Sequence, residues 1–116
     1  MSNTKSKMLN GYEIPYFKIC GLIRNTNSET KISIFDEGQQ MREGFNSGIY
    51  NVAIFVNKKL TVTFILREFS YENKIVIVQI DFKGKKISAN TEECKQLMEK
   101  YIPMIREMCL NPNKFK

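Results

Sequence analysis

The stretch from residue 91 to residue 110 constrains the fold most, because its apolar side chains recur at every third or fourth position. That spacing places them on one face of an α-helix. Asn90 or Thr91 can cap the N-terminus, and the two glutamates that follow suit the positive end of the helix dipole. The apolar positions are Cys94, Leu97, Met98, Tyr101, Ile102, Ile105, Met108 and Cys109.

Pro103 lies inside this stretch. Proline has no backbone N–H and clashes with the preceding turn, so it predicts a kink in the helix. The alternative is that the helix ends near Ile102 and that a second turn begins there.

The chain before this helix has the pattern of β-strands, with apolar side chains at alternate positions. We predict a mainly β domain over residues 14–110, with a flexible N-terminal arm (1–13) and a tail (111–116). Gly21 predicts a bend in the first strand. In the fifth strand, the apolar face is expected to carry the side chains of Val76, Val78, Ile80 and Phe82. Residues 39–48 are expected to form a loop or a short helical excursion. The predicted strands are 16–25, 30–35, 49–56, 60–67 and 75–82.

A five-stranded OB-like barrel with a C-terminal α-helix fits this order of elements. One departure is that an OB barrel usually carries a helix between its third and fourth strands. Only the turn at residues 57–59 separates those strands here.

Composition narrows the range of functions. The formal net charge of +6 favours acidic partners such as nucleic acid. The chain has no histidine, which removes Ser–His, Cys–His and histidine–metal chemistry. Three cysteines without CxxC spacing favour neither a zinc site nor a disulfide framework, and they are expected to be small buried thiols in a reducing compartment. We therefore expect no enzyme activity, no metal and no cofactor.

The sequence shows no apolar run near the roughly 20 residues that a membrane span needs, and no signal-peptide pattern near its start. The expected location is nuclear if the source is eukaryotic and cytoplasmic otherwise, and the protein is not expected to be secreted.

Two basic turns are the candidate nucleic-acid contacts. Tyr50, Phe55, Phe69 and Tyr71 offer surfaces on which bases could stack, although Phe55 and Phe69 are more simply interpreted as core residues. The lysines also have a simpler interpretation, as solubilising side chains that protect strand edges. The candidate lysines are Lys58, Lys59, Lys83, Lys85 and Lys86.

Residues 17–24 (FKICGLIR) and 31–38 (KISIFDEG) resemble the opening strands of small OB-fold subunits, in which a glycine is followed by an apolar residue and the second strand ends in an aspartate-containing turn. The compact size and terminal helix are similar to those of the smallest subunits of replication protein A and of the CST telomere complex. The resemblance implies a non-catalytic small subunit of a single-stranded-DNA-binding complex, for general replication or for telomeres. It also implies that the helix binds larger OB-fold subunits and that direct DNA contact is weak.

The helix stripe is wider than one small sheet is expected to cover, which predicts a partner surface on it. The candidate partner-binding residues are Leu97, Met98, Tyr101, Ile102, Ile105 and Met108. The alternative function is a small protein-binding adaptor or dimeric chaperone without a nucleic-acid role, because methionine-rich faces adapt to partner surfaces.

Overall fold

The computed structural model describes residues 12–25, 28–42 and 45–111. These residues form one antiparallel sheet and one long helix, with a short 3-10 turn, η2 (Ser70–Glu72), between two strands. The helix is α1 (Glu92–Leu110). The strands are β1 (Tyr12–Ile14), β2 (Leu22–Asn25), β3 (Thr30–Arg42), β4 (Phe45–Val56), β5 (Lys59–Phe69), β6 (Lys74–Phe82) and β7 (Lys85–Lys86).

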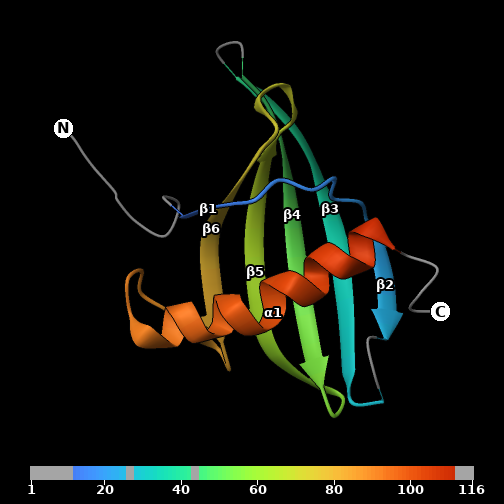
Figure 1. The fold of residues 1–116 in the computed structure, drawn as a ribbon, viewed down its shortest axis with the longest axis vertical. Coiled ribbons are helices and arrows are strands. Elements are labelled where there is room, and N and C mark those ends of the chain that lie inside the picture. Colours follow the sequence, from blue (N-terminus) through green and yellow to red (C-terminus); the bar gives the residue numbers. More distant parts are fainter. Residues whose placement is uncertain (1–11, 26–27, 43–44, 112–116) are drawn as a thin grey trace.

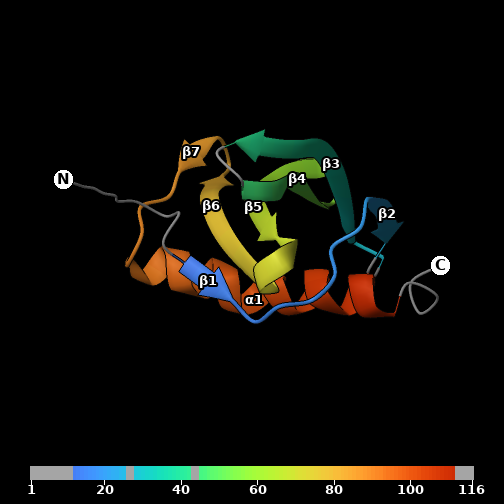
Figure 2. The ribbon, with the colours of Figure 1, turned by 90° about the horizontal axis from the view of Figure 1, so that it is seen from above.

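The strands from β2 to β6 pair in chain order, and β1 pairs with the free side of β6. The sheet is strongly curved, and α1 crosses one of its faces (Figures 1 and 2). The prediction of a mainly β fold with a C-terminal helix is confirmed. Closure into a barrel is not confirmed, because the paired path ends at β1 and β2 and, among the described strands, these two are not paired.

The core lies between the sheet and α1. Alternate residues of the central strands are buried, as the sequence predicts for Val62, Phe64 and Leu66 of β5. The ring of Tyr101 in α1 meets that of Phe64 edge-on, with 6.5 Å between the ring centroids. Burial of large apolar side chains contributes about 1.5–3 kcal/mol each, so this layer supplies much of the stability.

The helix begins where the sequence predicts. The Thr91 hydroxyl accepts a hydrogen bond of 3.1 Å from the Cys94 amide, which satisfies one of the free N–H groups at the helix start. Tyr12 of β1 ties the same region to the sheet, because its hydroxyl donates to the Asn90 side chain at 2.8 Å. Pro103 is exposed inside the continuous helix, so the alternative of an end near Ile102 is wrong.

The N-terminal part of the sheet differs from the prediction. Of the predicted first strand, only Leu22–Asn25 is a strand, while residues 15–21 cross the face that α1 also covers (Figure 1). Phe17 and Ile19 of this connection are buried. Gly21 therefore lies before β2 and is not a bend inside a strand. Residues 12 and 13, which the sequence placed in the arm, belong to β1.

Within the predicted loop at residues 39–48, residues 39–42 instead belong to β3 and residues 45–48 to β4, and the two strands pair there. The register shifts by one residue between Asp36 and Gly38, where Gly38 has a φ of 107° and its amide donates to the Asp36 carboxylate at 2.8 Å. A glycine allows such a left-handed backbone, so the bulge interrupts the alternation without ending the strand.

A second bulge changes which residues of β6 face the core. Ile65 of β5 pairs with Gln79 and Leu66 pairs with Ile77, so the alternation shifts at Val78. The buried residues are Ile75, Ile77 and Ile80, whereas Val76 and Val78 are only half-buried. The predicted apolar face of this strand is thus wrong on the N-terminal side of the bulge.

Candidate functional site

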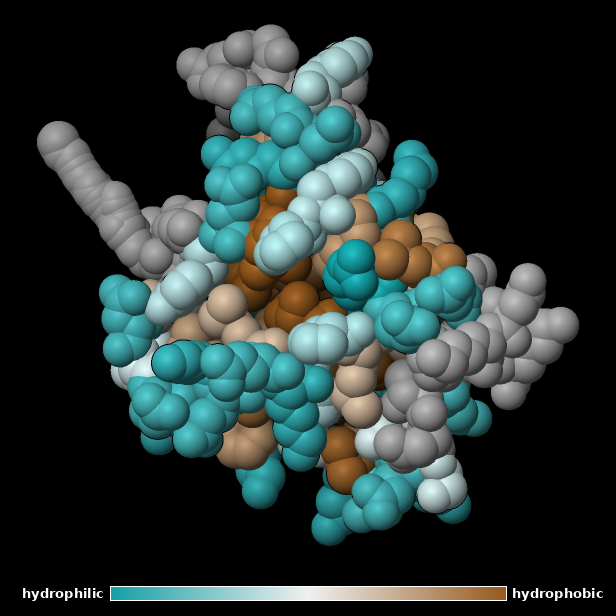
Figure 3. All heavy atoms as spheres, in the orientation of Figure 1, coloured by the Kyte–Doolittle hydropathy of each residue, from teal (hydrophilic) through white to brown (hydrophobic). Residues whose placement is uncertain are grey.

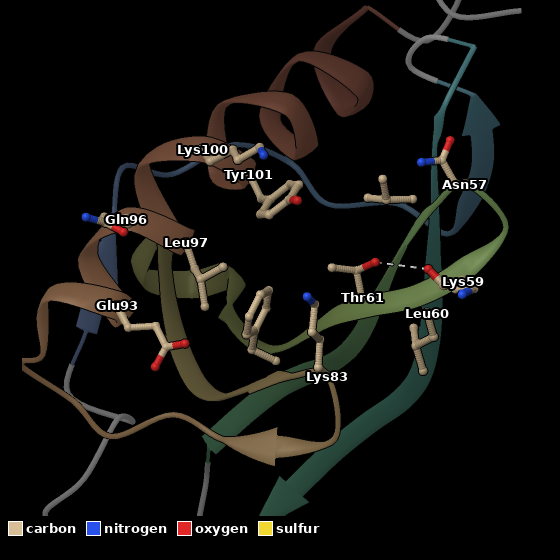
Figure 4. Close-up of a pocket in the computed structure, with 12 residues that line it drawn as sticks. Asn57, Lys59, Leu60, Thr61, Lys83, Glu93, Gln96, Leu97, Lys100 and Tyr101 are labelled. Carbon is tan, nitrogen blue, oxygen red and sulfur yellow. Dashed lines mark hydrogen bonds between the residues drawn. The ribbon is translucent and has the colours of Figure 1, made fainter.

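An open cleft lies between α1 and the ends of three strands, with a volume of about 840 Å³ (Figure 4). This is within the range of roughly 300–1,000 Å³ that is usual for ligand sites. Its lining residues come from the β4–β5 turn, the start of β5, the end of β6 and the N-terminal half of α1. They are Val56, Asn57, Lys59, Leu60, Thr61, Phe82, Lys83, Glu93, Gln96, Leu97, Lys100 and Tyr101.

The lining combines positive charge with apolar surface. Lys59, Lys83 and Lys100 are accompanied by one carboxylate, that of Glu93. The Lys83 side chain extends into the space between the strands and the helix (Figure 4). Its Nζ lies 5.2 Å from the ring centroid of Phe82, and the Nζ of Lys100 lies 5.3 Å from that of Tyr101. The cleft therefore suits a ligand that has both anionic and flat apolar parts.

Both basic turns predicted from the sequence lie at this end of the sheet. The Lys83 amide donates to the Thr61 carbonyl at 2.8 Å, which joins the turn after β6 to the start of β5. Lys58 is exposed on the first of these turns, and Lys85 and Lys86 are exposed in β7, directly after the second. The structure thus brings together two groups of lysines that are far apart in the sequence.

The backbone at these turns is unusual for lysine. Asn57 and Lys58 have φ angles of 53° and 67°, and Lys83 and Gly84 have φ angles of 51° and 82°. Two successive positive φ angles match the twist of a β-hairpin, but asparagine and glycine are the favoured residues. A lysine in this conformation costs about 1–2 kcal/mol relative to glycine. At two turns beside the cleft, lysine therefore occupies a position where another residue would give a more stable hairpin.

The predicted partner-binding residues lie mostly in the core. Leu97, Tyr101, Ile102, Ile105 and Met108 are buried in the chain's own fold, and only Met98 is half-buried. The stripe is covered because the sheet curves around the helix and residues 15–21 cover the same face. On the helix side of the molecule, hydrophilic side chains cover much of the surface, and smaller apolar patches lie between them (Figure 3). Most of the stripe is therefore covered by the chain itself, with Met98 and Cys109 only half-buried, and partner binding through α1 stays a prediction.

The burial of the four candidate stacking residues differs from the prediction. Tyr50 is buried, whereas Tyr71 is 85% exposed. Phe55 and Phe69 are half-buried and lie outside the core, so their interpretation as core residues is wrong.

At the other end of β5, Glu68 is buried and hydrogen-bonded. The Tyr16 hydroxyl donates to its carboxylate at 2.6 Å, and this bond and burial raise the pKa of Tyr16 to about 12. Burial and the Glu68 charge also raise the pKa of Tyr50 to about 12. This site links the connection at residues 15–21 to the sheet, and its polar groups already have partners.

The three cysteines are free thiols, and Cys20 and Cys109 lie close enough to interact with each other. Cys94 is buried, and burial raises the pKa of its thiol. Burial also raises the pKa of Cys109 to about 11, whereas Cys20 is exposed, contrary to the prediction of buried thiols. Within the described ranges, no three side chains of the kinds that bind metals are grouped together. No helix of the described chain combines the length and apolar character needed to cross a membrane.

Sequence reasoning missed Glu93, Lys100 and Phe82 as lining residues of the cleft. Lys100 lies beside the apolar stripe of a helix, where a lysine usually indicates only the solvent-exposed face.

Comparison with protein-family models, curated proteins and solved structures gave no match.

Proposed function

We propose that this protein binds single-stranded DNA in the cleft between α1 and the ends of β4, β5 and β6, as a non-catalytic small subunit of a larger DNA-binding assembly. The observation that carries the proposal is the meeting of lysines from two distant turns and a helix around an apolar floor. Single-strand binding needs positive groups for the phosphates and flat surfaces for the bases.

The charge of the cleft supports an anionic ligand. Lys59, Lys83 and Lys100 outnumber the one carboxylate of the lining, that of Glu93, so the cleft carries a net positive charge. Their charges are available to phosphates, whose counterions are released on binding. Phe82 and the 55%-exposed Leu60 supply apolar surface close to these charges.

The unusual turn residues support the same function. A strained backbone position suggests a role beyond stability, because a glycine would be more stable there. Lys58 and Lys83 occupy such positions in separate hairpins at the same end of the sheet. Contact with a phosphate backbone explains why both turns carry lysine.

Fluorescence anisotropy with labelled oligothymidylate tests the proposal. Binding should weaken as salt rises, and removing one lysine that neutralises a phosphate should reduce the slope of log affinity against log salt by about 0.7. The variant Lys59→Gln/Lys83→Gln should therefore bind more weakly and with a slope smaller by about 1.4. Lys18→Gln/Lys74→Gln, with the same charge change away from the cleft, is the control.

Equally weakened binding in the two double variants would mean that net charge alone drives binding. Absence of binding by the wild-type chain at low salt would contradict the proposal. It would favour the alternative of a protein-binding adaptor.

The subunit part of the proposal rests on the resemblance to small OB-fold subunits and on the helix. The residue of the predicted partner surface that α1 leaves accessible is half-buried Met98, at the edge of the buried stripe. Met98→Glu should then prevent co-purification with larger subunits and leave the fold intact. Ile105→Glu should unfold the chain, because it places a charge where the side chain is fully buried. Normal co-purification of a folded Met98→Glu protein would contradict assembly through α1.

A further inference from the structure

A second hollow, of about 490 Å³, lies on the other side of the β4–β5 turn from the cleft. It is formed by the end of β2, the beginning of β3, Phe55 near the end of β4, and the turn itself. Its lining residues are Asn25, Ser28, Glu29, Thr30, Lys31, Phe55 and Lys58.

Phe55 supplies a flat surface in this hollow. Its neighbours Ile54 and Val52 in β4 show which face is buried, and Phe55 points to the opposite face. Lys31 is its direct partner on β3, and the Lys31 Nζ lies 5.4 Å from the centroid of the Phe55 ring. A lysine beside a half-buried aromatic ring repeats the pairing of Lys83 with Phe82 in the cleft.

The β4–β5 turn separates the two hollows and contributes to both. Asn57 and Lys59 line the cleft, whereas Lys58 lines the second hollow. The Asn57 amide donates to the Glu29 carbonyl at 2.8 Å, which holds the turn against the segment before β3. Successive lysines of one turn therefore line adjacent hollows.

We infer that the second hollow is a separate nucleotide subsite, in which a base stacks on Phe55 and a phosphate lies between Lys31 and Lys58. The inference rests on the proposed function, because the same DNA strand would leave the cleft and cross the turn into this hollow. Lys58 and Lys59 hold the phosphates on either side of the crossing.

The test compares oligothymidylates of two lengths. One of about four nucleotides, near the short end of the sites seen for single binding domains, fills the cleft alone, and one of about ten reaches both hollows. Phe55→Leu should weaken binding of the longer strand about tenfold, because it removes the aromatic ring on which a base stacks. It should leave binding of the shorter strand unchanged.

Phe69→Leu is the matched control. Phe69 is also half-buried outside the core, and the Arg67 Cζ lies 5.9 Å from its ring centroid, but it is at the opposite end of β5. It should change the affinity for neither strand. Lys31→Gln should weaken binding of the longer strand only, which keeps the test valid if Phe55→Leu fails to fold.

The outcomes distinguish the two proposals. If both strands bind the wild type and Phe55→Leu binds the longer one equally well, the second subsite is contradicted and the cleft is not. If neither strand binds the wild type, the proposed function fails, and the subsite fails with it. Equally weakened binding in Phe55→Leu and Phe69→Leu would also contradict the subsite.

Discussion

The polar groups at the two ends of β5 differ in burial and in their surroundings. At its C-terminal end, Glu68 is buried and accepts a hydrogen bond from Tyr16, which closes the space between the sheet and residues 15–21. At its N-terminal end, Lys59 lies with Lys83 and Lys100 at the mouth of an open cleft. Buried polar groups need partners within the fold, whereas exposed ones can bind a ligand. The C-terminal end of β5, with Glu68 and Tyr16, therefore maintains the fold, and we call it the closed end. The N-terminal end, with Lys59, is free for binding, and we call it the open end.

The largest expected effect is on stability, at the closed end. Glu68→Gln should lower the free energy of unfolding by about 1–3 kcal/mol, because it weakens a hydrogen bond to a charged acceptor and leaves a buried amide to be satisfied. Lys83→Gln, an exposed change at the open end, should stay within about 0.5 kcal/mol of the wild type. Urea denaturation measures the free energy of unfolding of both variants. Equal decreases in the two would contradict the distinction between the ends of β5.

The two tyrosines at the closed end should also make the stability of the fold depend on pH in the alkaline range. The folded pKa of Tyr16 and of Tyr50 is about 12, above the usual value of 10.0. A group whose pKa is raised by folding stabilises the fold fully below its unfolded pKa and loses that contribution as pH rises through the folded value. Stability should therefore fall between about pH 10 and 12, as measured by denaturation at several pH values.

Tyr16→Phe should lose less stability than the wild type over that pH range, because it has one group fewer to ionise. The matched variant Tyr71→Phe removes an 85%-exposed tyrosine and should follow the wild-type curve. A Tyr16→Phe curve parallel to that of the wild type would show that the bond to Glu68 does not cause the effect.

At the open end a substitution should improve the fold and impair binding. Lys58→Gly relieves the positive φ of 67° and should raise the free energy of unfolding by about 1 kcal/mol. The same change removes a positive charge that would neutralise a phosphate and should weaken oligothymidylate binding. Thermal melting and anisotropy on one sample measure the two effects, and a gain in both would argue that Lys58 has no binding role.

The smallest effect concerns Gly21, on the connection. A Cβ there would lie 3.5 Å from the Ile34 carbonyl oxygen, an ordinary contact, and Gly21 is not among the glycines with positive φ. Gly21→Ala should therefore raise the free energy of unfolding by about 0.4–1 kcal/mol, through lower entropy of the unfolded chain. A large decrease in the melting temperature would restore the sequence-based view of Gly21 as an obligatory bend.

The sequence correctly predicted the buried face of those strands in which apolar residues alternate without interruption. Ile32, Val52 and Phe64 are buried in strands that have neighbours on both sides, so simple alternation identifies their faces. Alternation failed in β6 because a bulge at Val78 moves Ile77 inward. It failed before β2 because Phe17 and Ile19 are buried in a crossing segment that has no ladder.

The candidate site was only partly predictable. The lysine-containing turns were visible as short polar segments between apolar runs. Their meeting with Lys100 depends on the order of the sheet and on where α1 crosses it, which local patterns do not encode. Phe55 was assigned to the core because aromatic residues in strands usually are buried, but Val52 and Ile54 of the same strand face the core, so Phe55 faces outward.

The most direct test of the contrast between the two ends is an NMR titration of isotopically labelled protein with oligothymidylate at low salt. We expect saturable amide shifts around Lys59, Lys83 and Lys100, and little change around Tyr16 and Glu68. Shifts that gather around Tyr16 and Glu68, or none at any residue, would contradict the assignment of binding to the open end.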